Sequence, residues 1–131
     1  MPDKNKTAEK PTTPQQTGAD EKTKTKKKFY CGGVSLKTIL FFTKNIGIMI
    51  RSGSTLAEAL QVLQLQAKGK FKDILIEVSG KIQRGMSFSD SLAEAPKIFS
   101  EMYINIVRIG EESGTLDKNI EYLTSQLEKS Y

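Results

Sequence analysis

The residue types that could carry chemistry gather in one acidic stretch near the end of this chain. Asp117 and Glu121 are four residues apart, so on a helix their carboxylates share one face and could bind a hard cation such as calcium. The spacing matches no calcium-binding loop, and two carboxylates supply too few oxygens, so a second chain would have to complete the shell. The alternative is a solvated acidic face, to which Lys118 supplies countercharge.

The rest of the residue inventory disfavours an enzyme. The 131 residues include no histidine, which removes the commonest general base and metal ligand. The single cysteine, Cys31, lacks an activating partner and cannot form a disulfide within the chain, which fits a reducing compartment. Gly32-Gly33 is not followed by the Gly-Lys-Ser/Thr of a phosphate-binding loop. We therefore expect no catalytic residue and no cofactor beyond the divalent cation considered above.

Two further glutamates stand at a sharp corner between two amphipathic segments, in the run Gly110-Glu111-Glu112-Ser113-Gly114. Both lie near the carboxyl end of a predicted helix, where the helix dipole disfavours an anion. A residue placed against local preference often has a tertiary partner. One interpretation of Glu111 is an internal ion pair with Arg51, Arg84 or Arg108, or a hydrogen bond to the start of the next helix. The other is that this corner, with Arg108, docks a partner protein.

The elements that must position these residues are helices. Apolar residues recur at helical spacing after Ser35, as in Phe71, Ile74, Leu75, Val78 and Ile82, and no segment alternates with period two. Thr55 with Glu58 predicts a capping box. A fifth helix from near Ser100 is expected to bury Met102, Tyr103, Ile106 and Val107. Connections of two to five residues predict an all-α fold, a compact antiparallel bundle of six short helices.

The basic character of the chain belongs to its beginning. The net charge is +5, and residues 1–30 contain eight of the 20 basic residues but only four of the 15 acidic ones. We predict a disordered basic tail over residues 1–32 and a helical domain over 33–131. Three interpretations are open for the lysines nearest the domain: contact with a membrane surface, a solvated linker, or contact with nucleic acid. These lysines are Lys22, Lys24, Lys26, Lys27 and Lys28.

Neither a signal peptide nor a membrane-spanning helix is expected. The first residues lack the apolar segment of a signal peptide. The most apolar stretch, Ile39 to Ile50, contains Lys44 and Asn45 and is too short to cross a bilayer.

Several motifs taken together resemble the F domain of type II secretion systems, which is also found in type IV pilus assembly machines. A phenylalanine-containing helix ends in Arg51-Ser52-Gly53, and Leu56-Ala57-Glu58-Ala59-Leu60 follows. Further on come Gly85-Met86-Ser87-Phe88-Ser89-Asp90-Ser91-Leu92, then Pro96, Phe99 and Tyr103, and finally Gly110–Gly114 with Leu116. The likeness covers about residues 35–131. Lys44-Asn45, where the family often has Gln, and Ser100, where it often has Pro, are local departures.

The resemblance implies a non-enzymatic scaffold, the N-terminal cytoplasmic domain of a longer platform protein in the bacterial inner membrane. The expected partners are the cytoplasmic assembly ATPase, other inner-membrane assembly proteins, pilin or pseudopilin subunits, and further copies of the chain. An alternative function is a helical nucleic-acid-binding domain with a basic arm. The near-neutral charge of the domain and the lack of a basic recognition helix argue against nucleic acid as a partner.

Overall fold

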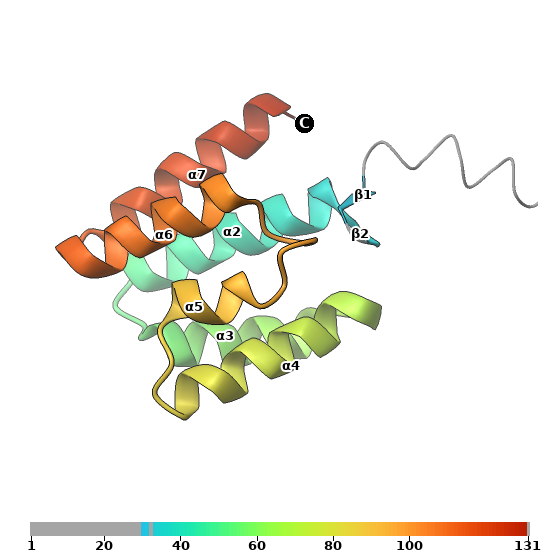
Figure 1. The fold of residues 1–131 in the computed structure, drawn as a ribbon. Helices are drawn as coiled ribbons and strands as arrows, with labels where there is room; N and C mark the ends of the chain where they lie inside the picture. The colour runs from blue at the N-terminus through green and yellow to red at the C-terminus, as the bar shows by residue number, and fades with distance from the viewer. Residues whose placement is uncertain (1–29, 32, 131) are drawn as a thin grey trace, which may run out of the picture.

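The computed structural model describes residues 30–31 and 33–130. Within these residues six helices pack together, in agreement with the predicted all-α bundle (Figure 1). Of the tail that we expected over residues 1–32, only Tyr30 and Cys31 are among the described residues. The helices are α2 (Leu36–Arg51), α3 (Leu56–Gln66), α4 (Gly69–Gln83), α5 (Phe88–Ala93), α6 (Glu101–Ser113) and α7 (Leu116–Ser130).

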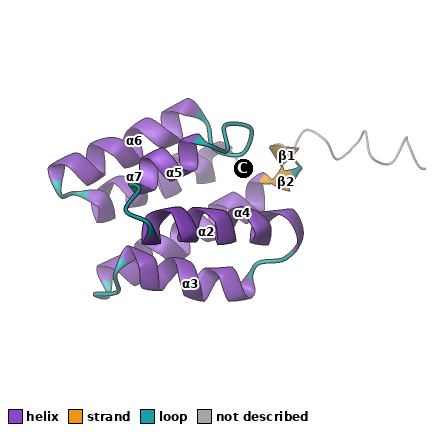
Figure 2. Ribbon diagram, turned by 60° about the horizontal axis from the view of Figure 1, so that its bottom comes forward, coloured by secondary structure: helices purple, strands orange, loops and turns teal. Residues whose placement is uncertain are grey.

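Two very short strands precede the helices. β1 (Tyr30–Cys31) pairs antiparallel with β2 (Val34–Ser35), so that Tyr30 faces Ser35 and Cys31 faces Val34. Each strand has two residues, which is too short to give a period-two pattern, so this hairpin could not be predicted from the sequence. Figure 2 shows this hairpin at one end of the bundle, where the chain enters α2.

Hydroxyl side chains set the starts of four helices. Ser35, Thr55, Ser87 and Ser100 each accept a hydrogen bond from the backbone N–H three residues later. An N-cap of this kind typically stabilises a helix by about 1 kcal/mol. The predicted capping box at Thr55 is confirmed, because the Glu58 carboxylate also accepts from the Thr55 backbone N–H at 3.0 Å. These caps explain why short segments begin as helices at the observed residues.

The first and last helices of the bundle pack along each other. α2 lies beside α7 on one side and α3 on the other, while α6 bridges α5 and α7 (Figures 1 and 2). Gly47 on α2 permits this approach, since a methyl group built there would lie 3.2 Å from Cγ2 of Ile120. Two ion pairs follow the same contact, Lys44 with Glu128 at 4.0 Å and Arg51 with Glu121 at 3.3 Å. Both pairs are exposed, so burial of apolar surface is the main force holding α2 to α7.

A cluster of aromatic rings joins the two halves of the bundle. Phe42 of α2 meets Phe71 of α4 edge to face, with ring centroids 5.3 Å apart. Phe99, just before α6, lies 6.4 Å from Phe42 and 5.2 Å from Tyr103 of α6. All four side chains are buried. Such ring pairs add about 0.5–1.5 kcal/mol each beyond the area they bury.

One polar contact crosses this apolar core. The Thr43 hydroxyl donates to the carbonyl oxygen of Ile39 at 2.7 Å and lies 2.7 Å from the Tyr103 hydroxyl. Because the single proton of Thr43 goes to Ile39, Tyr103 must donate to Thr43. Burial raises the pKa of the Tyr103 hydroxyl.

One expectation about the core is wrong. Met102 was predicted to be buried on α6, but its side chain is 51% exposed, and Ile104 is buried instead. The buried face of α6 runs through Tyr103, Ile104, Val107 and Gly110. Several apolar residues of this segment allow more than one stripe, and the packing of α7 against Gly110 selects the observed one.

The buried phenol predicts how stability changes with pH. Tyr103 has a higher pKa in the folded chain than its ordinary value of 10.0. Above that value the unfolded chain releases the proton and the folded chain keeps it, so the free energy of unfolding falls as pH rises. The slope from this group approaches about 1.4 kcal/mol per pH unit. Denaturant unfolding of wild type and Tyr103→Phe between neutral pH and pH values above 10 measures it.

Tyr103→Phe is expected to lose about 1 kcal/mol at neutral pH, because one buried hydrogen bond disappears. Its stability should then fall less steeply than that of wild type in alkaline solution. Tyr122→Phe is the matched control, since Tyr122 is exposed. If the free energy of unfolding changed with pH in the same way for wild type and Tyr103→Phe, the raised pKa of Tyr103 would be contradicted.

Candidate partner-docking site

The predicted corner is a tight reversal between α6 and α7. Gly114 ends α6 in the left-handed conformation, with φ of +72°, a region that favours glycine. The backbone N–H of Thr115 then returns to the carbonyl of Gly110 at 2.9 Å. α7 begins at Leu116, so only two residues separate the two helices.

Gly110 differs from Gly114 in its role, because its lack of a side chain allows α7 to approach α6 closely. A methyl group built on Gly110 would lie 2.9 Å from Cα of Leu116 and 3.1 Å from Cβ of Asn119. Because the two helices lie so close together, the Asn119 side chain reaches α6, where its Nδ2 donates to the carbonyl of Ile106 at 2.9 Å. Thr115 donates in turn to Oδ1 of Asn119 at 3.2 Å. The corner is therefore held by backbone contact and by a short chain of polar bonds.

The Glu111 carboxylate, on α6, binds the start of the neighbouring helix α5. Oε2 accepts from the backbone N–H of Phe88 at 2.7 Å. Oε1 accepts from the backbone N–H of Ser89 at 3.1 Å and from its hydroxyl at 2.6 Å. These N–H groups at a helix start have no partner within the helix. The carboxylate satisfies them, and the positive end of α5 offsets the unfavourable position of Glu111 on α6.

This contact decides between the internal alternatives stated for Glu111. No arginine pairs with it among the described residues. Arg51 pairs with Glu121, and Arg108 pairs with Asp90. Glu111 does bind a helix start, but that helix is α5, which precedes it in the chain, rather than the next helix. This pairing could not be predicted from the sequence, because no local pattern in either segment indicates it.

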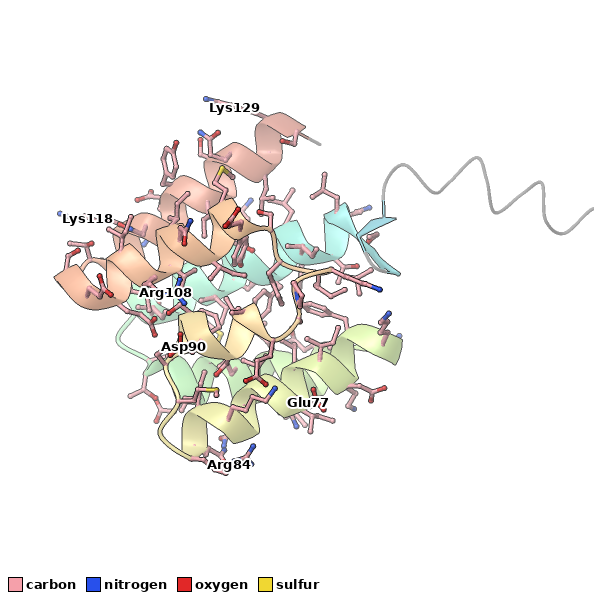
Figure 3. The ribbon with its side chains drawn as sticks, in the orientation of Figure 1. Glu77, Arg84, Asp90, Arg108, Lys118 and Lys129 are labelled. Carbon is pink, nitrogen blue, oxygen red and sulfur yellow. The ribbon has the colours of Figure 1, made fainter. Side chains whose placement is uncertain are left out.

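A second ionic contact ties α5 to α6. Arg108 Nη2 donates to Oδ1 of Asp90 at 3.0 Å, and the two side chains point toward each other in Figure 3. Arg108 Nη1 also lies 3.4 Å from Oδ1 of Asn105. The hydrogen bond from Arg108 lowers the pKa of the Asp90 carboxyl, and a second one from Ser87 acts in the same direction. The Arg108 side chain is therefore already bonded to other residues of this chain.

The remaining residues of the corner face solvent. Glu112 and Ser113 are exposed, and the Ser113 hydroxyl donates back to the carbonyl of Ile109. Ile109 itself is 56% exposed. Of the five residues from Gly110 to Gly114, Glu112 is thus the charged side chain left for a partner, and its role as a contact stays a prediction.

The exposed apolar side chains beside the corner form a larger surface. Met102 and Ile109 are seven residues apart and lie on one side of α6. Tyr122 is 53% exposed, and it follows Asn119, whose side chain reaches α6, by three residues. Tyr122 therefore lies on the side of α7 that borders α6. We call Met102, Ile109, Glu112 and Tyr122 the docking face.

Asp117 and Glu121, the pair considered for calcium, differ in their surroundings. Glu121 is exposed and pairs with Arg51, and Asp117 is half-buried. Across residues 30–31 and 33–130, no group of three or more Cys, Asp or Glu side chains is arranged to hold a metal ion. A calcium site at this pair stays a prediction that needs ligands from a second chain.

Two other expectations concern the membrane. None of the helices in the described part of the chain has the length and apolar character needed to cross a bilayer. The five tail lysines proposed to meet a membrane surface, Lys22, Lys24, Lys26, Lys27 and Lys28, lie outside the described residues.

Comparisons with known proteins define the family to which this helical bundle belongs. Residues 42–131 match the family described as type II secretion system (T2SS), protein F. The chain therefore belongs to the type II secretion system protein F family, as its motifs predicted.

Relatives come from both kinds of machine. The chain is 42% identical over 98 residues to the type IV pilus assembly protein PilC of Thermus thermophilus, covering 74% of this chain and 24% of that protein. It is 37% identical over 100 residues to PilC of Myxococcus xanthus, with shares of 76% and 24%. Type II secretion system protein F of Vibrio cholerae is 32% identical over 97 residues, with shares of 73% and 24%. The chain thus spans about a quarter of the length of these curated relatives.

The close approach at the corner predicts opposite effects for two glycines. Gly110→Ala should destabilise the domain by about 1–3 kcal/mol, because the new methyl group would overlap the backbone of α7. Gly80→Ala, inside α4, should stabilise by about 0.5–1 kcal/mol, since helix interiors favour alanine and the nearest atom is in ordinary contact at 3.5 Å. Chemical denaturation of both variants measures the difference. Equal effects would contradict a packing role for Gly110.

The two neighbouring glutamates provide a matched pair. Glu111→Ala should cost about 2–3 kcal/mol of unfolding free energy, because charge-assisted hydrogen bonds to two N–H groups are lost. Glu112→Ala should stay within about 0.5 kcal/mol of wild type, as exposed substitutions usually do. Amide hydrogen exchange at Phe88 and Ser89 should accelerate only in the Glu111 variant. Unchanged protection there would show that the carboxylate does not hold α5.

Proposed function

We propose that this chain is a non-enzymatic scaffold domain in the inner-membrane platform of a type II secretion or type IV pilus assembly machine. In this proposal the domain lies on the cytoplasmic side and docks the assembly ATPase. Membership of the protein F family supports a role in one of these machines. Contacts with pilin or pseudopilin subunits, other inner-membrane assembly proteins and further copies of the chain belong to the same proposal.

The observation that carries the docking proposal is the docking face on a rigid support. Large side chains of the kind that anchor protein interfaces, such as Met102 and Tyr122, stand in solvent on adjoining helices. The helices beneath them are fixed by the Gly110 contact and by the binding of Glu111 to α5. Such a surface loses little conformational entropy when a partner binds.

Rigidity also suits a scaffold that passes movement from one component to another. α5, α6 and α7 are joined by directional bonds in addition to apolar burial: Glu111 to Phe88 and Ser89, Arg108 to Asp90, and Asn119 to Ile106. A displacement imposed on one of these helices is therefore transferred to the others. This transfer requires no catalytic group.

A binding experiment with the cognate assembly ATPase tests the proposal. Ile109→Ser combined with Tyr122→Ser should weaken capture of the ATPase at least tenfold, about 1.4 kcal/mol, as expected for loss of interface anchors. The positions are exposed, so the fold should persist, which helicity by circular dichroism verifies. Glu112→Lys tests the charge at the corner without touching the cap of α5.

The matched control is Ile48→Ser combined with Val62→Ser, which removes exposed apolar side chains from α2 and α3 instead. This control should bind the ATPase like wild type. Equal binding by all variants would remove the docking face from the interface. Equal weakening in the control would show that exposed apolar area alone, rather than this face, drives capture.

A further inference from the structure

A groove of about 680 Å³ opens at the end of the bundle where the chain enters its first helix. The segment from β2 into α2 forms one side, and the junction between α3 and α4 forms the other. We call it the lysine groove, after three of its lining residues. Its lining residues include Gly33, Lys37, Phe41, Lys68, Lys70 and Phe71.

The charge of the lysine groove is of one sign. Lys37, Lys68 and Lys70 line it, and none of its lining residues is an aspartate or glutamate. Lys37 and Lys68 are exposed and take part in no ion pair within residues 33–130. The Lys70 side chain lies over Gly33, with Nζ 3.4 Å from the position of a methyl group built there. The groove therefore attracts an anion.

Apolar side chains accompany these lysines. Phe41 lines the groove and is 59% exposed. Leu65, one residue before the groove-lining Gln66, is 77% exposed. Lysines with an exposed aromatic ring and a leucine are the combination found on protein surfaces that lie in a bilayer interface. There the ammonium groups meet headgroups and the apolar side chains enter the layer below.

The position of the groove joins it to the most basic part of the sequence. β1 begins at Tyr30, two residues after Lys28, the last of five lysines between residues 22 and 28. The hairpin that contains Gly33 lies at the same end of the bundle as the end of α7 (Figures 1 and 2). In the sequence, the basic run therefore comes a few residues before Gly33, which lines the groove.

We propose that this end of the bundle lies against an anionic bilayer surface, where Lys37 and Lys68 contact phosphate-bearing headgroups and Phe41 enters the headgroup layer. The other candidate occupant is an acidic helix of a partner protein. The bilayer is favoured because the sequence that leads into the groove-lining hairpin is basic as well, with five lysines between residues 22 and 28. An extended anionic surface attracts basic residues of both segments, whereas an acidic helix in the groove would pair with the groove lysines.

Vesicle flotation with the full chain tests this proposal. Vesicles of phosphatidylglycerol and phosphatidylethanolamine should bind the protein, and phosphatidylcholine vesicles should not. Lys37→Gln combined with Lys68→Gln should weaken binding to the anionic vesicles about 25-fold, since each basic residue near such a surface contributes about fivefold. Added salt should weaken wild-type binding further, because it screens exposed charges.

Two matched controls separate the groove from charge in general. Arg84→Gln combined with Lys118→Gln removes the same charge from the opposite end of the bundle, where Figure 3 labels both side chains. This control should bind almost as wild type does. Phe41→Ser should weaken binding severalfold, whereas Ile48→Ser, two turns along the same face of α2, should not.

Three results would overturn the proposal. The first is an equal loss in the Arg84/Lys118 control, which would indicate net charge alone. The second is full binding by the Lys37/Lys68 variant with loss only after Lys26, Lys27 and Lys28 are changed to Gln, which would assign the contact to the basic run. The third is unchanged vesicle binding with lost capture of a partner protein, which would assign the groove to an acidic protein surface.

These results are independent of the docking proposal. The lysine groove lies at the junction of α3 and α4, and the docking face lies on α6 and α7. The Ile109/Tyr122 variant should float with anionic vesicles as wild type does, and the Lys37/Lys68 variant should capture the ATPase normally.

Discussion

The arrangement of the second half of this domain depends on one carboxylate. Glu111 extends from the last turn of α6 and accepts hydrogen bonds from Phe88 and Ser89 at the start of α5. α5 has six residues, too few to be stable alone, and its first N–H groups would otherwise lack partners. The carboxylate thereby fixes the position of α5, whose Phe88 and Leu92 side chains are buried in the core. Two sequence motifs that are more than twenty residues apart are in this way parts of one contact.

Much of this fold could be predicted from the sequence, because its helices carry their own start signals. Thr55 with Glu58 forms the expected capping box, and the stripe beginning at Phe71 faces the core as its spacing indicated. Local pattern failed where two choices were nearly equal, as at Met102, since the packing partner rather than the helix itself decides which apolar side is buried. The binding of Glu111 to α5 and the gathering of Lys37 with Lys68 depend on tertiary contact, which spacing along the chain does not encode.

The residues of the run Gly110–Gly114 have different structural roles, which follow from their chemistry. Gly110 is small so that α7 can approach, Gly114 takes a left-handed turn, and Glu111 binds α5. Glu112 is the charged side chain of the run that remains in solvent. The run Gly110–Gly114, for which one interpretation was a docking site, therefore makes mostly internal contacts, and the surface that we propose for partners is the apolar border of α6 and α7. The lysine groove, at another junction of the bundle, gives the domain a second surface of different character.

The packing of α2 against α7 has a consequence for biosynthesis. Among the described helices, α2 leaves the ribosome first, and part of its apolar face is buried against α7, the last of them, where Ile120 meets Gly47. Residues 36–115 can form helices and local pairs while translation continues, yet the core stays open along α2 until α7 has emerged. Nascent chains of this domain therefore present an uncovered hydrophobic strip during most of their synthesis, and a chaperone at the exit tunnel would meet it there.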